Sequence, residues 1–176
     1  MRMQTRLRLD RGVLMALIAL TSLAGCGSDG GFTAAANLNG TYTVAVTDAD
    51  NGCNIDNWET GKSTSDIPFL IEQDGTTVNG TLQGVAAVAL GLSIGTNKFQ
   101  GTASSSTFQI TAYGTIPRNQ NNCTFTLNAG ISGQISGDAI SGTISYAPAA
   151  SDNPDCASLQ CTSTQNFNGT RPPAAQ

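Results

Sequence analysis

The residues most able to do chemistry in this chain are its cysteines, because histidine is absent. The five cysteines are Cys26, Cys53, Cys123, Cys156 and Cys161. A chain without histidine lacks the commonest general base and the commonest metal ligand. A serine, threonine or cysteine nucleophile would need Lys62, Lys98 or a carboxylate as its base, and no motif supplies that pairing. We therefore expect a protein that is not an enzyme, with no catalytic residue and no cofactor.

Cys26 stands at the end of a segment typical of export signals. Basic residues from Arg2 to Arg11 precede an apolar run, Val13 to Leu20, which is too short to span a bilayer. The run leads to Leu23-Ala24-Gly25-Cys26, which resembles the lipobox of bacterial lipoproteins. The resemblance implies a signal peptide over residues 1–25, cleavage before Cys26, and lipidation and acylation (palmitate) of that cysteine.

The residue after the lipobox bears on the destination of the protein. Gly27 follows the cysteine, whereas an aspartate there often keeps such lipoproteins at the inner membrane. The resemblance therefore implies a lipid-anchored protein of the bacterial outer membrane. Residues 26–36 are rich in Gly, Ala and Ser and predict a lipidated flexible tether.

The four remaining cysteines predict two disulfides, because an even number in an oxidising compartment is typical of disulfide-stabilised domains. Zinc is the alternative. Cys156 and Cys161 lie near each other in the sequence, but Cys53 and Cys123 are isolated and no second close pair exists. The spacing favours disulfides, and four cysteines allow three pairings.

The charge balance excludes some partners. After residue 25 the chain has four basic residues against eleven carboxylates (the twelve of the whole chain less Asp10). An acidic chain with no basic run is a poor candidate for binding nucleic acid or anionic lipid headgroups. We therefore expect no nucleic-acid partner.

From residue 37 onward, short alternating segments rich in Thr, Val, Ile and Phe predict strands. The eight expected strands are 38–47, 66–73, 76–84, 94–103, 107–116, 122–134, 138–146 and 161–171. Tight connections alternate with long ones, which are expected at 48–65, 85–93, 117–121 and 147–160. This alternation predicts an all-β domain over residues 37–176, a small antiparallel up-and-down β-barrel whose last strand pairs with its first.

The cysteines agree with that topology. All four fall at or beside the end of the barrel that carries the long loops, so this end is expected to be disulfide-stapled. There, Cys161 is expected near Cys53, and Cys123 near Cys156. A glycine recurs within most of the expected strands, as in Val78-Asn79-Gly80-Thr81-Leu82. Strand glycines permit the sharp bends that close a barrel.

A short motif links the two ends of the expected barrel. Gly40 and Tyr42 lie on the first strand and Arg171 ends the last. This pattern resembles the calycin superfamily, the lipocalins and avidins, in which a first-strand tryptophan packs under a late arginine. Tyrosine replaces tryptophan here. The resemblance implies a barrel in which Arg171 caps Tyr42 by a cation–π contact.

Three features are candidates for binding. Asp48, Asp50 and Asp56 could supply oxygen ligands to Ca²⁺, although solvated acidic loops are the simpler interpretation. Trp58, in the first long loop, could contact a partner or a sugar, or cover the end of the barrel. The apolar stretch 84–95, which contains Val88 and Leu90, could cover a cavity, or be a buried strand end or a short helix.

The leading functional expectation is a non-catalytic binding module of the cell envelope. Its long loops would bind an envelope protein or a glycan, and its N-terminal lipid would anchor it to the membrane. The alternative is a lipocalin-like carrier of a small apolar ligand, because eight strands enclose an interior that is either packed or holds one small ligand. An enzyme of unknown type comes third.

Overall fold

The structure is a computed structural model that describes residues 35–120, 122–150, 154–157 and 159–173. The chain divides into two compact units, Met1–Gly31 and Phe32–Gln176, and every described residue belongs to the second. Cys26, residues 1–25 and most of the expected tether lie outside the described residues, so the lipidation, cleavage and destination expected there stay predictions. Within the described ranges no helix is long and apolar enough to cross a membrane.

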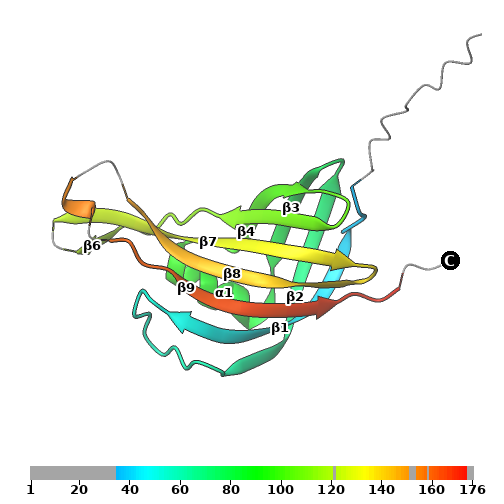
Figure 1. The fold of residues 1–176 in the computed structure, drawn as a ribbon, viewed down its shortest axis with the longest axis horizontal. Helices are drawn as coiled ribbons and strands as arrows, with labels where there is room; N and C mark the ends of the chain where they lie inside the picture. Colours follow the sequence, from blue (N-terminus) through cyan, green and yellow to red (C-terminus); the bar gives the residue numbers. More distant parts are fainter. Residues whose placement is uncertain (1–34, 121, 151–153, 158, 174–176) are drawn as a thin grey trace, which may run out of the picture. The chain divides into compact units, whose positions relative to one another are not determined.

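The described chain is built almost entirely from strands. In chain order the elements are β1 (Gly40–Asn51), β2 (Ser63–Asp74), β3 (Thr77–Leu82), α1 (Gly84–Ile94), β4 (Lys98–Ala103), β5 (Thr107–Ala112), β6 (Arg118–Gln120), β7 (Cys123–Ser136), β8 (Ala139–Ala150), the 3₁₀ turn η1 (Pro154–Cys156) and β9 (Ser163–Thr170). Figure 1 shows the long strands β7, β8 and β9 running side by side.

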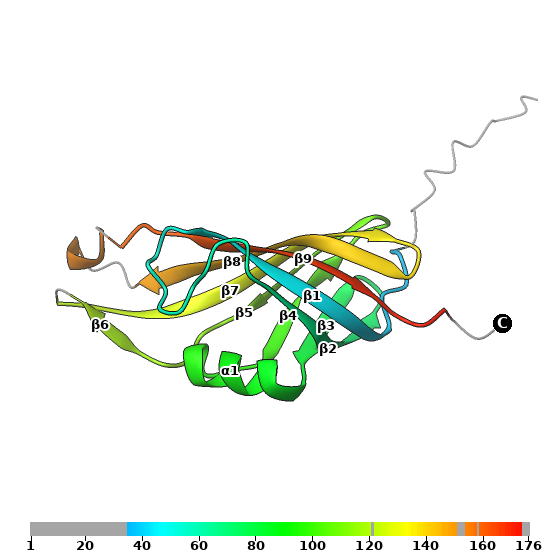
Figure 2. The same ribbon diagram turned by 90° about the horizontal axis from the view of Figure 1, so that it is seen from below.

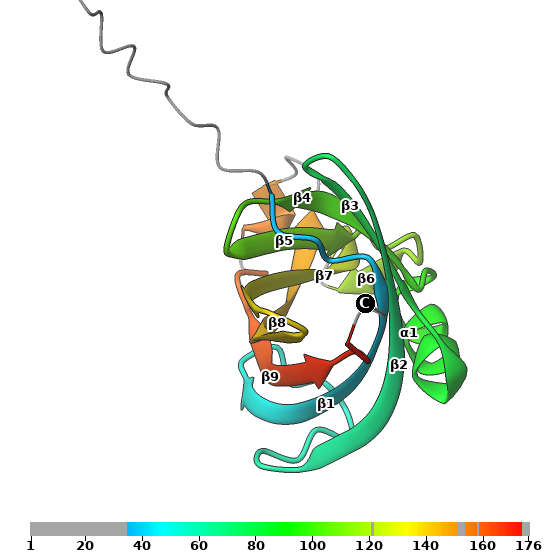
Figure 3. The same cartoon turned by 90° about the vertical axis from the view of Figure 1, so that its right-hand side faces the viewer.

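Eight of these strands form a closed antiparallel barrel, as the sequence predicts. Neighbours along the chain pair in turn from β1 to β5, then β5 with β7, β7 with β8 and β8 with β9. The barrel closes where β1 pairs with β9, with Val44 opposite Gly169. Figure 3, viewed from the side of the tight turns, shows the strands as a ring with α1 on its outer side. The up-and-down topology is confirmed.

Alternation along the strands separates a core from an outer surface. In β5, Phe108 and Ile110 are buried whereas Thr107 and Gln109 are exposed, because successive residues of a strand point to opposite faces. The same alternation in the other strands gives one apolar cluster inside the barrel. Its aromatic members are Tyr42, Phe69, Phe99, Phe108 and Phe167.

Two strand glycines make room for those aromatic rings. A Cβ atom added at Gly80 would lie 2.5 Å from the Phe69 ring, and one at Gly133 would lie 2.3 Å from the Phe108 ring. Both distances are far below van der Waals contact, so the rings need these positions to be glycine. The recurrent glycine motif therefore serves interior packing, in addition to the strand bending that the sequence suggests.

Several element boundaries differ from the expected ones. β1 continues to Asn51 and β2 begins at Ser63, so the first long loop is shorter than predicted. A short strand, β6, lies in the expected loop 117–121 and forms a hairpin with the start of β7. The expected loop 85–93 is the helix α1. The connection lengths agree with the predicted alternation: tight turns join β2 to β3, β4 to β5 and β7 to β8.

Both disulfides have the pairing expected from the topology. Cys53 is bonded to Cys161, and Cys123 to Cys156, each with a Cα–Cα distance of 4.9 Å. The zinc alternative is therefore wrong. The first bond joins the end of β1 to the residues before β9, and the second joins β7 to η1. Both lie at the end of the barrel that carries the long connections, which we call the open end.

The opposite end, which we call the closed end, carries the cap that the calycin resemblance implies. The Arg171 guanidinium lies over the Tyr42 ring, 5.5 Å from its centroid. Arg171 Nε donates a hydrogen bond to Asp138 Oδ1 at 2.9 Å, and Nη2 donates one to the Asn37 carbonyl at 2.9 Å. Nη1 also donates to the Asn39 carbonyl. One side chain thus ties together the N-terminal segment, the turn before β8 and the end of β9.

Candidate ligand-binding site

A cavity of about 790 Å³ lies at the open end of the barrel. This volume is within the range of about 300–1,000 Å³ typical of small-molecule sites. Three parts of the chain line the cavity: the inward faces of the strands, the first long loop and one face of α1. The barrel is therefore packed solid toward its closed end and hollow toward its open end.

Most of the cavity wall is apolar strand surface. The strand residues that line it include Val44, Val46, Ile67, Phe69, Leu82, Phe99, Leu127, Ile131, Ile144 and Phe167. They come from β1, β2, β3, β4, β7, β8 and β9, so nearly the whole ring of strands contributes. Each occupies an inward position of its strand, because inward and outward side chains alternate around a barrel.

The helix α1 forms the second wall. Ala86, Ala89, Leu90 and Ile94 line the cavity, and Leu90 and Ile94 are buried in the core. The helix packs against β2, β3 and β7. In the order of the barrel β4 and β5 lie between β3 and β7, so α1 contacts strands on either side of β4 and β5. Figure 2 shows the helix below the strands, at one edge of the barrel.

The sequence explains where α1 begins and ends. Alanine and leucine favour the helix, which starts after Gln83 without a side-chain cap and ends at Gly95 with φ of 88°. A Cβ atom added at Gly95 would lie 2.1 Å from Thr115 Oγ1. Thr115 N donates to the Ile94 carbonyl at 2.7 Å. Glycine thus permits both the left-handed turn and the close contact that attaches the helix to the segment after β5.

A chain of hydrogen bonds forms the polar part of the wall. Tyr146 Oη donates to Gln165 Oε1 at 2.9 Å, and Gln165 Nε2 donates to Asp48 Oδ1 at 2.6 Å. All three residues line the cavity. Burial raises the pKa of Tyr146 to about 12, and the nearby charge of Asp48 acts in the same direction. Because these polar groups satisfy one another, an apolar ligand can lie against them without leaving them unpaired.

Trp58 lies at the mouth of the cavity, half-buried. Its ring packs edge-on against Tyr146 with 5.9 Å between centroids, and its Nε1 donates to the Ala49 carbonyl at 3.2 Å. The indole is therefore turned inward, with its only donor occupied. Of the two positions that the sequence allows, contact with an outside partner or coverage of the barrel end, this geometry matches the second.

The rim of the cavity is irregular on the β2 side. The register of β1 against β2 shifts between Val44 and Val46, which pair with Ile67 and Thr64. The extra residues form a bulge in which Asp66 has φ of 60°, the left-handed region that few non-glycine residues adopt. Bulges bend a strand and are frequent at the rims of barrels. Here the bulge lies along the cavity wall.

The other expected site residues are only partly brought together. Asp48 lines the cavity, but Asp50 and Asp56 do not. Among the residues that the structure describes, no three His, Cys, Asp or Glu side chains form a group that could hold a metal ion. Leu90 and Val88 also lie on different faces of α1. Leu90 lines the cavity, whereas Val88 is exposed on the outer face.

Several wall residues were not expected from the sequence. Tyr146 and Gln165 lie on β8 and β9, far from Asp48 and Trp58 along the chain, and the pairing of β1 with β9 and of β9 with β8 brings them together. The available signal is inward alternation on the predicted strands. It identifies the apolar wall but does not show that the space between its members is empty.

Comparison of the chain with protein families, with curated proteins and with solved structures finds no match. The fold and the cavity therefore define the class of the protein. It is a closed eight-stranded antiparallel barrel with one additional strand and two disulfides, an architecture compatible with a calycin-like fold.

Proposed function

We propose that this protein is an extracytoplasmic, lipid-anchored barrel that binds a small apolar molecule in the cavity at its open end. The observation that carries the proposal is the cavity of about 790 Å³ with its predominantly apolar wall. Apolar cavities with few polar groups are the usual form of small-molecule sites. The lipid anchor, at Cys26, and its outer-membrane destination rest on the lipobox resemblance alone.

Binding of an envelope protein or a glycan by the long loops stays a prediction from the sequence. No structural observation favours it over ligand binding, because the indole of Trp58 faces the cavity and its donor is occupied. The absence of histidine argues against catalysis in the same cavity.

The single tryptophan of the chain offers a direct test, since Trp58 lines the cavity. We expect its fluorescence to change saturably when a fatty acid or a similar apolar probe is titrated. Ala86→Phe places a ring in the cavity and should weaken the apparent affinity at least tenfold. Val88→Phe is the matched control, because Val88 lies on the same helix and points outward; it should bind as the unmodified chain does.

Native mass spectrometry of the chain produced in a bacterial periplasm gives a second measurement. A mass above that of the oxidised chain that disappears on organic extraction would support the proposal and identify the ligand. Equal affinity of the Ala86→Phe and Val88→Phe variants, or no saturable response of Trp58 to any apolar probe, would overturn it.

A further inference from the structure

The outer face of α1 is an apolar surface that the barrel leaves uncovered. Among the described residues, the large hydrophobic side chains that are exposed are Val85, Val88, Leu92 and Tyr113, at 86%, 62%, 78% and 66%. The first three lie on one side of α1, because residues three and four apart share a helix face. A helix that is apolar all round is normally buried, yet this one is buried on one side only.

Tyr113 is in the segment between β5 and β6, which is hydrogen-bonded to the end of α1. It directly follows β5, two residues before Thr115, whose backbone binds the C-terminal end of α1. Along the chain, Tyr113 therefore lies within two residues of a backbone contact with α1. We call Val85, Val88, Leu92 and Tyr113 the helix patch.

Charge around the helix patch differs from charge elsewhere. No aspartate or glutamate occurs between Asp74 and Asp138, a stretch that covers β3 to β7 and includes α1. The charged residues of this stretch are Lys98 and Arg118. The stretch that contains α1 therefore carries two cations and no carboxylate, whereas β2, which also packs against α1, carries Asp66, Glu72 and Asp74.

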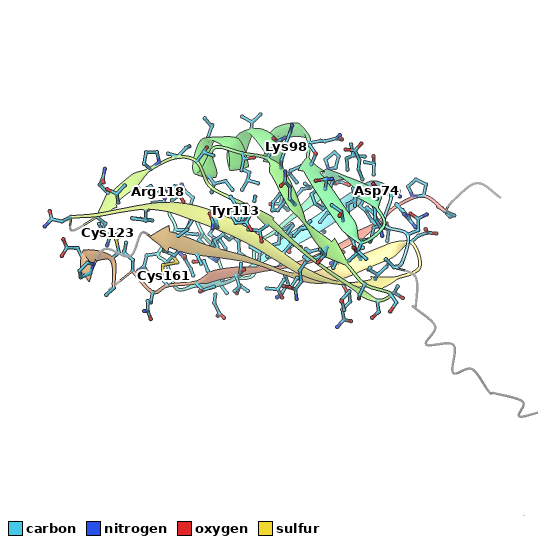
Figure 4. The ribbon with its side chains drawn as sticks, turned by 90° about the horizontal axis from the view of Figure 1, so that it is seen from above. Asp74, Lys98, Tyr113, Arg118, Cys123 and Cys161 are labelled. Atoms are coloured by element: carbon cyan, nitrogen blue, oxygen red, sulfur yellow. A yellow bond between two sulfur atoms is a disulfide. The ribbon has the colours of Figure 1, made fainter. Side chains whose placement is uncertain are left out.

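Both cations are placed beside α1. Lys98 begins β4, four residues after the last residue of the helix. Arg118, which also lines the cavity, donates from Nη2 to the Ser93 carbonyl near the helix end at 2.8 Å. The ion pairs among the described residues use Lys62 and Arg171, so neither Lys98 nor Arg118 is neutralised by a carboxylate there. Figure 4 shows Lys98 and Arg118 on the side of the barrel that carries α1.

We propose that the helix patch, flanked by Lys98 and Arg118, docks on the surface of a phospholipid bilayer. Helices that lie in the membrane interface bury an apolar face about 5–10 Å into the boundary of headgroups and acyl chains. Aromatic rings such as that of Tyr113 and basic side chains lie at the level of the headgroups. Valine and leucine at the centre with lysine, arginine and tyrosine at the edge match that arrangement.

A second copy of the chain fits the helix patch less well. A two-fold symmetric contact places the same surface on both partners, so Lys98 and Arg118 of the two copies would approach each other without carboxylates between them. Phosphate groups of a bilayer would instead neutralise both cations. Charge therefore favours a lipid surface over self-association.

The inference goes beyond ligand binding and does not depend on it. The side of α1 that carries Ala86, Ala89 and Leu90 lines the cavity, together with Val85 at the edge of the helix patch, so docking would bring one wall of the cavity to the bilayer surface. The docking surface would exist even if the cavity bound nothing. Its test must accordingly report contact with lipid without using a cavity ligand.

Quenching of tryptophan by brominated phospholipids reports that contact in the full chain, however the chain is anchored. The reporter is Val88→Trp in a Trp58→Phe background, on vesicles of phosphatidylcholine with a minor share of phosphatidylglycerol. The matched control is Ser141→Trp in the same background, because Ser141 is exposed on β8, away from α1. We expect a blue shift and severalfold stronger quenching for the Val88 reporter, and weaker quenching when Lys98→Gln is added.

Two outcomes would overturn the proposal. Equal quenching of the Val88 and Ser141 reporters would show that α1 has no preferred contact with lipid. A blue shift at Val88 that grows with protein concentration and is insensitive to brominated lipid would assign the helix patch to self-association. Urea unfolding of both reporter variants establishes that they are folded. A failure of the Trp58 titration with apolar probes would leave these results unaffected.

Discussion

The two ends of the barrel are stabilised in different ways. At the closed end the interior is filled by side chains such as Leu38 and Tyr42, which are fully buried, and Arg171 joins three segments by hydrogen bonds. At the open end the interior is a cavity, and both disulfides lie in the connections around it.

The difference shows how a small barrel can keep a cavity at one end of its interior. Burial of apolar surface is the main favourable term in folding, and a cavity forgoes part of it. Disulfides offset the loss by restricting the unfolded chain, and they need no interior atoms to do so. In this protein covalent bonds therefore lie where packing is incomplete, and non-covalent interactions are sufficient where packing is complete.

The largest effect should come from the disulfide that spans most of the chain. Cys53→Ala with Cys161→Ala removes a disulfide between residues 108 apart in the sequence. The loss of loop-closure entropy should lower the free energy of unfolding by about 4–5 kcal/mol. The pair Cys123→Ala with Cys156→Ala, at a separation of 33, should cost about 1 kcal/mol less. Urea unfolding measures both. A larger loss for the shorter bond would contradict the entropic account.

Removing Arg171, at the closed end, should cause the next largest loss of stability. Arg171→Ala breaks an ion pair in which the arginine side chain is 11% exposed, and it removes the cation over Tyr42. Asp138 is 39% exposed, so the loss should lie between the roughly 1 kcal/mol of an exposed pair and the roughly 3 kcal/mol of a buried one. Arg171→Lys should recover only part of that, because lysine cannot reproduce the fork of donors. If Arg118→Ala, an exposed arginine at the open end, destabilised the fold equally, the contrast between the ends would be lost.

Alkaline pH should destabilise the protein through Tyr146. Its pKa is about 12 in the folded chain, against 10 as its ordinary value, so the folded state favours the neutral phenol. Stability is complete below pH 10 and falls as pH rises toward 12, because the unfolded chain ionises first. The expected loss is about 2 kcal/mol. Tyr146→Phe should be less stable at neutral pH, having lost the hydrogen bond to Gln165, yet show a flatter profile between pH 10 and 12.

The smallest effect concerns Tyr42, whose hydroxyl is buried and makes no hydrogen bond to any described residue. Burying such a group without a partner is unfavourable. Tyr42→Phe should therefore leave stability unchanged or raise it by up to about 1 kcal/mol, while the ring keeps its contact with Arg171. Thermal unfolding measures the change. A clear loss of stability would show that the hydroxyl has a partner, such as a buried water molecule.

The sequence predicts the barrel better than the site. Alternation of side chains in segments such as Thr107–Ala112 is a local property, so strands can be recognised one at a time. The disulfides follow from topology once the alternation of tight and long connections places Cys53 near Cys161. The cap of Arg171 on Tyr42 follows from a short motif that resembles the calycins.

The cavity could not be predicted, because it depends on how side chains from distant strands fill a common space. Gly80 and Gly133 show the difficulty, since a phenyl ring from another strand fills the space beside each of them. The contact of Asp48 with Gln165 likewise depends on the register of β1 against β9. The lack of acidic residues between Asp74 and Asp138, in contrast, is visible in the sequence. Its relation to the exposed face of α1 becomes visible only in the folded structure.

The pairing of β1 with β9 also determines the order in which the barrel can assemble. Every other neighbouring pair of barrel strands is close along the chain, with only the short β6 between β5 and β7, whereas β1 must wait for a partner near the C-terminus. Contacts between distant segments form slowly, so β1 keeps an unpaired edge until the chain is nearly complete. The bond from Cys53 to Cys161 can form in its native place only then. An oxidant that acted earlier would trap a mispaired cysteine, and recovery would require exchange of disulfides.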